Sequence, residues 1–166
     1  MSVALDILRT YRAPRRVLRG RVMGPAREDR ALAVLMGGCV LMFAAQWPRL
    51  SREAHFDDSI GLEPLLAGAL FGWVLLAPLF FYGVALITIW ALKLAGSIAT
   101  GFEVRMALFW ALLASCPLWL LTGLMAGFVG PGPVTTGVGL LAFGAFLVFW
   151  VAGTTEVATY RSEGRV

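Results

Sequence analysis

Four long blocks of the sequence contain no charged residue and no histidine, and this constrains the fold more than any other feature. The blocks cover residues 31–47, 65–92, 106–129 and 134–155. An uncharged apolar run of about 18 or more residues is long enough to cross the hydrocarbon core of a bilayer as a helix. The sequence therefore predicts a polytopic membrane protein.

The composition agrees with a chain that has lipid as its main solvent. Of 166 residues, 59% are hydrophobic and only 14% are charged, which is too little polar surface to cover a soluble core of this size. No stretch outside the four blocks is long enough to fold alone. We expect an all-α membrane protein, a bundle of four transmembrane helices over residues 31–158, preceded by an amphipathic interfacial helix and followed by a short cytoplasmic tail, residues 159–166.

The net charge of +4 is concentrated before the first block, where eight arginines meet three acids within residues 1–30. A cationic segment next to a membrane span indicates topology and contact with anionic lipid rather than nucleic-acid binding. We therefore expect membrane lipids, and no nucleic acid, as partners of this segment.

Residues 3–12 have apolar positions at helical spacing, with polar residues on the other side. This pattern is typical of a helix lying in the membrane interface, and we expect Ile7, Leu8 and Tyr11 to face the acyl chains. The alternative is a disordered cytoplasmic tail. In the helical interpretation, lipid headgroups contact five basic residues, namely Arg9, Arg12, Arg15, Arg16 and Arg19.

The distribution of Lys and Arg predicts the orientation. With four spans, one side of the membrane receives both termini and the hinge 93–105, which together hold twelve basic residues, whereas the other side holds two. The positive-inside rule then places both termini in the cytoplasm. Taken with the preference for Arg over Lys, this favours a bacterial inner membrane.

Prolines and glycines predict where the spans end or bend. Trp47-Pro48 is expected to end the first span, because proline removes a backbone donor. The block 65–92 is longer than a bilayer needs, so it must tilt, kink at Pro78 or extend beyond the membrane to Lys93. Pro117 predicts a bend in the third span, and residues 130–133 (Gly-Pro-Gly-Pro) predict a tight helical hairpin.

The sequence contains little that suggests chemistry. Ion transport usually requires ionisable residues inside the membrane, and no span of this chain contains one. His55 is the only histidine. Cys39 and Cys116 fall in apolar blocks, where cysteine behaves as a small hydrophobe. We expect no catalytic residue, no cofactor and no metal site, although three acids of the loop could in principle hold a cation rather than form a solvated surface: Glu53, Asp57 and Asp58.

Two spans carry pairs of glycines four residues apart, a spacing that leaves one helix face without side chains. The pairs are Gly68 with Gly72 and Gly123 with Gly127. Such a face lets a second helix approach closely. It could serve packing within the bundle or contact with another protein.

The stretch 90–119, WALKLAGSIATGFEVRMALFWALLASCPLW, resembles the signature region of the Yip family, the Ypt-interacting proteins. In that family a span ends in a Gly-containing hinge, followed by a Gly-Phe-like pair and a span that carries a proline. The matching positions are Gly96, Gly101, Phe102 and Pro117. The family usually has five spans, whereas this chain has four, and its eukaryotic members carry an acidic N-terminal motif that is missing here. The resemblance implies a membrane scaffold without enzymatic activity, and it does not carry over binding to a small GTPase.

These features favour a non-catalytic integral membrane protein that acts by helix packing and lipid contact. It would be a Yip-like scaffold or an accessory subunit of a larger assembly, with other membrane proteins or further copies of itself as partners. The alternative is a small transporter or channel that uses the proline-broken helices at Pro78 and Pro117, because such breaks free backbone carbonyls for ion binding.

Overall fold

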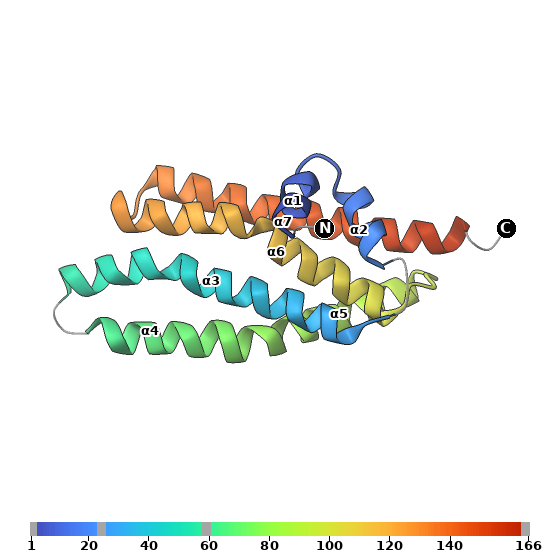
Figure 1. The fold of residues 1–166 in the computed structure, drawn as a ribbon, viewed down its shortest axis with the longest axis horizontal. Helices are drawn as coiled ribbons and strands as arrows, with labels where there is room; N and C mark the ends of the chain where they lie inside the picture. Colours follow the sequence, from blue (N-terminus) through green and yellow to red (C-terminus); the bar gives the residue numbers. More distant parts are fainter. Residues whose placement is uncertain (1–2, 23–25, 58–60, 164–166) are drawn as a thin grey trace.

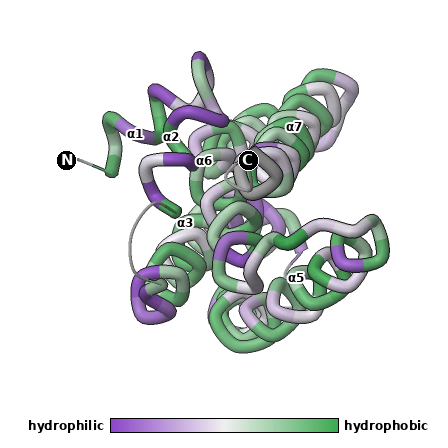
Figure 2. Tube along the Cα trace, turned by 90° about the vertical axis from the view of Figure 1, so that its right-hand side faces the viewer, coloured by the Kyte–Doolittle hydropathy of each residue, from purple (hydrophilic) through white to green (hydrophobic). Residues whose placement is uncertain are grey.

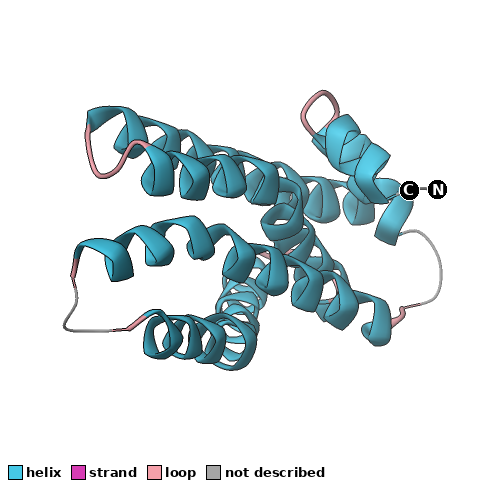
Figure 3. Ribbon diagram, turned by 60° about the vertical axis from the view of Figure 1, so that its left-hand side comes forward, coloured by secondary structure: helices cyan, strands magenta, loops and turns pink. Residues whose placement is uncertain are grey.

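A computed structural model describes residues 3–22, 26–57 and 61–163 of the chain, the side chains of 160–163 excepted. Every regular element among these residues is a helix (Figure 3). In chain order they are α1 (Val3–Thr10), α2 (Pro14–Val22), α3 (Glu28–Phe56), α4 (Leu62–Leu70), the π-helical segment η1 (Phe71–Leu76), α5 (Ala77–Leu94), α6 (Gly101–Phe128) and α7 (Pro133–Glu163).

Four of the helices are long and apolar enough to cross a membrane, which confirms the predicted fold class. They are α3, the continuous α4–η1–α5 helix, α6 and α7. This is the architecture of an integral membrane protein. Figure 1 shows them running roughly along the long axis of the molecule, with α1 and α2 lying across α6 and α7.

Helix α6 is the centre of the bundle. Side chains from Met106 to Cys116 are all buried, because α3, α5, α7 and the two N-terminal helices surround this half of α6. Of the 18 residues in the most apolar stretch of α6, 56% are buried, compared with 11% in the corresponding stretches of α4–η1–α5 and of α7. Helix α3 is intermediate at 39%, so α6 is the most buried of the four long helices and the α4–η1–α5 helix and α7 are the most exposed.

Helix α3 does not end at Trp47-Pro48, and that expectation was wrong. The helix continues through Pro48 to Phe56. A proline inside a helix costs about 3 kcal/mol through its lost hydrogen bond and its steric clash. Packing beyond the proline offsets this cost, since Leu50 is buried and Pro48 lies directly against Gly127 of α6.

The long second block is one helical segment with a π-helical turn in its middle. Pro78 lies just after η1, at the start of α5. Its missing N–H cannot bond to the carbonyl of Val74, and a wider turn is a common way for a helix to absorb such a defect. The segment also extends past the apolar block to Lys93 and Leu94.

Helix α6 begins at Gly101, directly after its N-cap residue Thr100. The Thr100 hydroxyl accepts a hydrogen bond from the Glu103 amide, and the Glu103 carboxylate accepts one from the Thr100 amide, which forms a capping box. Pro117 lies inside the helix, and Figure 1 shows α6 changing direction along its length. The connection before it turns at Gly96, whose φ of +78° favours glycine.

Helix α7 is longer than the uncharged block that predicts it. The helix extends from Pro133 to Glu163, so the expected cytoplasmic tail is helical over all of its described residues, 159–163. The backbone hydrogen bonds of a helix lie within the segment itself, so the helix can continue past the end of the apolar block.

The bundle has two different ends. We name the end at which α3 and α6 begin and α5 and α7 finish the hairpin end, because α1 and α2 pack on the halves of α6 and α7 next to it. The opposite end, where residues 129–132 join α6 to α7, is the groove end. Figure 2 shows hydrophilic stretches in α1 and α2 beside the mainly hydrophobic long helices.

Candidate functional site

The α1–α2 hairpin is attached to α6 by hydrogen bonds from its buried side. The Trp110 indole N–H donates to the Thr10 hydroxyl oxygen at 3.1 Å, and the Thr10 hydroxyl donates to the Asp6 carbonyl at 2.7 Å. The Tyr11 hydroxyl donates to the Ala114 carbonyl at 3.1 Å. These bonds satisfy polar groups that would be costly to bury alone, and they place α1 alongside the middle of α6.

Ion pairs hold the hairpin together and join it to α7. Arg21 Nη2 donates to the Asp6 carboxylate at 2.7 Å, which links α2 to α1. Arg19 Nε donates to the Glu156 carboxylate at 2.7 Å, which links α2 to α7. Leu18, next to Arg19, is buried beside Gly153 of α7 and belongs to the hydrophobic core, so the hairpin shares the core of the bundle.

Arg21 is the most enclosed of the hairpin arginines. Its guanidinium carbon lies 3.5 Å from the centre of the Trp110 ring, close enough for a cation–π contact. Burial lowers the pKa of Arg21, and the neighbouring Asp6 carboxylate opposes that shift. An arginine stays protonated under such conditions, so Arg21 carries a fixed positive charge beside the ring.

Some apolar side chains of the α1 segment pack against the bundle, and others are exposed. Ile7 packs partly against the core, and the Tyr11 ring meets Phe149 of α7 edge-on at 5.1 Å between ring centres. Leu8 is 67% exposed, and Val3 and Leu5 are each about half exposed. The predicted helix is present, whereas the face predicted for the acyl chains is only partly available to lipid.

A basic pocket lies between α1 and α2. It encloses about 450 Å³ and is lined by four arginines, Arg9, Arg12, Arg16 and Arg21, with Asp6 as the only acid. Asp6 pairs with Arg21 and, at 3.6 Å, with Arg9. Arg12 and Arg16 make no ion pair with a described residue. Of the five predicted headgroup residues, the pocket contains three; Arg15 does not line it, and Arg19 pairs with Glu156.

An apolar groove of about 910 Å³ adjoins this pocket. The two cavities share Asp6, Gly20 and Arg21. From there the groove extends along α3 past Val34 and Val40, where Gly37 and Leu41 of α3 and Leu113 of α6 also line it. A cationic cavity therefore opens beside an apolar one at the hairpin end.

The two glycine pairs lie in different surroundings. A Cβ added at Gly123 would lie 1.8 Å from the Ala45 carbonyl oxygen, and one at Gly127 would lie 2.5 Å from Pro48 Cβ. These glycines let α6 touch the backbone of α3. Gly68 and Gly72 have no atom within 4 Å of such a Cβ, and they line a cavity of about 420 Å³ between α4 and α3.

The four residues singled out in the stretch 90–119 lie in the connection before α6 and in α6 itself. Gly96 adopts its positive φ in the hinge, and Gly101 is the first residue of α6. Phe102 is buried in the core, and Pro117 lies exposed within α6.

Other chemistry is sparse in the part of the chain that the structure describes. No group of three or more metal-ligating side chains occurs there, and Cys39 and Cys116 are both buried and unpaired. Sequence reasoning missed the roles of Asp6, Thr10 and Arg21. The signal was present, because a lone acid and a threonine four residues apart lie on one face of α1, but their partner on α6 could not be identified from spacing.

Comparison of the chain with protein-family models, with curated proteins and with solved structures finds no match.

Proposed function

We propose that this protein is a non-catalytic integral membrane protein that binds an anionic phospholipid at its hairpin end, and that it serves as a scaffold or accessory subunit within the membrane. The observation that carries this proposal is the basic pocket that opens beside an apolar groove. An amphiphile with a negative headgroup matches both cavities at once.

The charge of the pocket favours a phosphate. Four guanidinium groups face one carboxylate, and Arg12 and Arg16 hold no described acid. Arginine presents planar donors that match phosphate oxygens, often two at a time. Basic pockets at the cytoplasmic ends of transmembrane helices bind such headgroups, and the excess of Lys and Arg at this end supports a cytoplasmic location.

The neighbouring groove supplies a place for an acyl chain. Its wall on α3 has Arg30 near the start of the helix, and beyond it consists of apolar residues that include Val34, Gly37 and Val40. Apolar burial stabilises a chain there by roughly 0.8 kcal/mol per methylene group removed from water. A chain leaving the surrounding bilayer gains much less, so the headgroup contacts would set the selectivity.

Arg16 and Arg15 provide a matched test, because both are exposed residues of α2 and only Arg16 lines the pocket. We expect Arg16→Gln to weaken phosphatidylglycerol binding about fivefold, the effect of one basic residue near an anionic group. Arg15→Gln should change it less than twofold. Native mass spectrometry of the detergent-purified protein, with phosphatidylcholine as the neutral comparison, would measure both.

Equal losses in the two variants would mean that the whole basic surface attracts lipid, and the pocket would then have no specific role. Unchanged binding in Arg16→Gln would also contradict the proposal.

The scaffold part of the proposal is supported by the exposed apolar surface of α5. Leu79, Phe80 and Ile87 of α5 are each at least 66% exposed, so α5 leaves a broad apolar face for a partner helix or for lipid. A Yip-like role fits the placement of the hinge glycines and Pro117. Gentle extraction followed by sizing would test it, and a monomer without companions would count against the subunit version.

The transport alternative stays a prediction. Pro78 follows the π-helical turn and Pro117 lies inside α6, and both prolines free a backbone carbonyl. Solute flux in reconstituted vesicles that is abolished by Pro117→Ala, with the protein still folded, would replace the scaffold proposal.

A further inference from the structure

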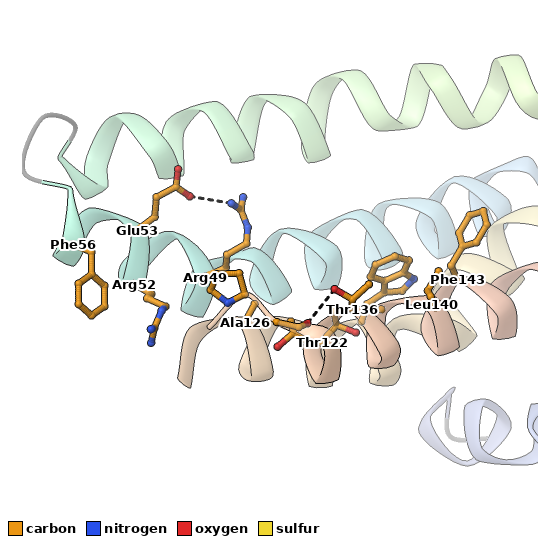
Figure 4. Close-up of a pocket in the computed structure, with 14 residues that line it drawn as sticks. Arg49, Arg52, Glu53, Phe56, Thr122, Ala126, Thr136, Leu140 and Phe143 are labelled. Atoms are coloured by element: carbon orange, nitrogen blue, oxygen red, sulfur yellow. Dashed lines mark hydrogen bonds and ion pairs between the residues drawn. The ribbon is translucent and has the colours of Figure 1, made fainter. Parts of the chain in front are cut away.

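Another cavity lies at the groove end, at the opposite end of the bundle from the basic pocket. It encloses about 910 Å³ between the last turns of α3, the second half of α6 and the first half of α7. Figure 4 shows Arg52 and Phe56 extending from α3, with Thr122 and Ala126 of α6 and Thr136, Leu140 and Phe143 of α7 along its length. We name this cavity the far groove.

The far groove has one cation that no described acid neutralises. Arg49 lies at its edge but pairs with Glu53 at 2.9 Å, and Figure 4 shows this pair on the other side of α3 from Arg52. Arg52 donates one hydrogen bond, from Nη1 to the Gly127 carbonyl at 3.2 Å, and it lies over the Phe56 ring. A guanidinium has five N–H donors, so most of those on Arg52 are available to an acceptor.

The position of Arg52 is fixed by the turn between α6 and α7. Its guanidinium lies against Gly130, where an added Cβ would be 2.9 Å from Nη2, and Gly130 has a φ of +95°. The side chain is therefore held between the α3 helix and this turn. A cation held in place loses less conformational entropy on binding an anion than a free one does.

The rest of the far groove changes from polar to apolar with depth. Thr135 and Thr136 lie near the start of α7, and their hydroxyls donate to the carbonyls of Gly130 and Gly132, which leaves their oxygens as acceptors. Further along lie Trp119, Leu140 and Phe143, which belong to the uncharged blocks. This order, from a fixed cation through hydroxyls to aromatic and aliphatic side chains, is that of a lipid from headgroup to acyl chain.

We propose that the far groove binds an anionic phospholipid from the leaflet opposite to the termini, with its phosphate on Arg52 and one acyl chain between Trp119, Leu140 and Phe143. This site is separate from the hairpin pocket and shares no residue with it. A zwitterionic phospholipid also carries a phosphate, but the cation of its own headgroup offsets that charge and weakens its attraction to Arg52. A free fatty acid offers a carboxylate in place of the phosphate and lacks the second chain.

Two variants test the two halves of the site. Arg52→Gln removes the cation, and Gly139→Leu places a side chain in the apolar part, because Gly139 lines the groove and a Cβ there meets Thr122 at an ordinary 3.5 Å. Gly137→Leu is the matched control, since a Cβ at Gly137 meets nothing within 4 Å and the residue lies outside the groove.

The experiment is native mass spectrometry of the full chain titrated with phosphatidylglycerol, phosphatidylcholine or oleate, in a background that carries Arg16→Gln. We expect phosphatidylglycerol binding to fall about fivefold with Arg52→Gln, to fall at least as much with Gly139→Leu, and to stay within twofold with Gly137→Leu. Thermal unfolding of each variant identifies any that fails to fold, and Gly139→Leu retains the Arg52 contact with Gly127.

Three outcomes would overturn the proposal. They are a Gly137→Leu loss equal to that of Gly139→Leu, equal affinity for phosphatidylcholine and phosphatidylglycerol, and tighter binding of oleate than of either phospholipid. Because every variant carries the same weakened hairpin pocket, the differences between Arg52→Gln, Gly139→Leu and Gly137→Leu report on the far groove, independently of the result for the hairpin pocket.

Discussion

Two glycine pairs with the same spacing differ completely in what they do. Gly123 and Gly127 bring α6 into backbone contact with α3, whereas Gly68 and Gly72 face an unfilled space between α4 and α3. Lipid tails are as apolar as leucine, so apolarity gives no reason for membrane helices to associate; close packing does. The comparison shows that a glycine pair marks an interface only when the facing helix offers a surface small enough to approach.

The largest effect in this comparison is expected at Gly123. Gly123→Ala would place Cβ 1.8 Å from the Ala45 carbonyl oxygen, so α3 and α6 must separate. We expect a loss of roughly 3 kcal/mol in the free energy of unfolding, at the upper end of the usual range for overpacking. Unfolding in mixed detergent micelles measures it. A loss below about 1 kcal/mol would mean that the two helices are not in contact there.

A smaller effect is expected at Gly38, on the other side of the same interface. Its added Cβ would meet the Leu112 side chain at 3.1 Å, and a side chain yields more easily than a backbone. We expect Gly38→Ala to cost about 1 kcal/mol. The double variant with Leu112→Ala should show a favourable coupling, because the truncated side chain makes room for the new methyl group. Additive losses would contradict the contact.

The smallest effect is expected at Gly68. Gly68→Ala enters open space, so the free energy of unfolding should change by about 0.5 kcal/mol or less. The same micelle unfolding measurement applies. A loss as large as that at Gly123 would show that another helix packs on this face in the membrane, which would sharpen the scaffold proposal by locating its interface.

The sequence was sufficient to predict the four spans, because charge is excluded from hydrocarbon whatever the neighbours are. It was not sufficient at Pro48, where the helix continues because Leu50 and Gly127 supply packing that no local pattern contains. The same reason explains α1, whose helical period was visible while its orientation depended on Trp110 and Ala114, about a hundred residues away.

The candidate sites were predicted only in part, because contacts between distant residues decide which side chains remain available to a ligand. A run of arginines indicates affinity for anions, so Arg9, Arg12 and Arg16 could be proposed from the sequence. Which arginines are already neutralised depends on distant acids, as with Arg19 and Glu156. The far groove was not predicted, since Arg52, Trp119 and Leu140 come from three helices and share no spacing along the chain.

The pair between Arg19 and Glu156 joins positions 137 residues apart, and this has a consequence for the order in which the protein is made. Helix α2 leaves the ribosome long before α7, and contacts between such distant segments form late in folding. Until α7 has entered the membrane, the hairpin lacks Glu156, Gly153 and Phe149 as neighbours. Docking of the N-terminal helices therefore marks the completion of the bundle, and a nascent chain that stops before α7 would leave its arginines without this partner helix.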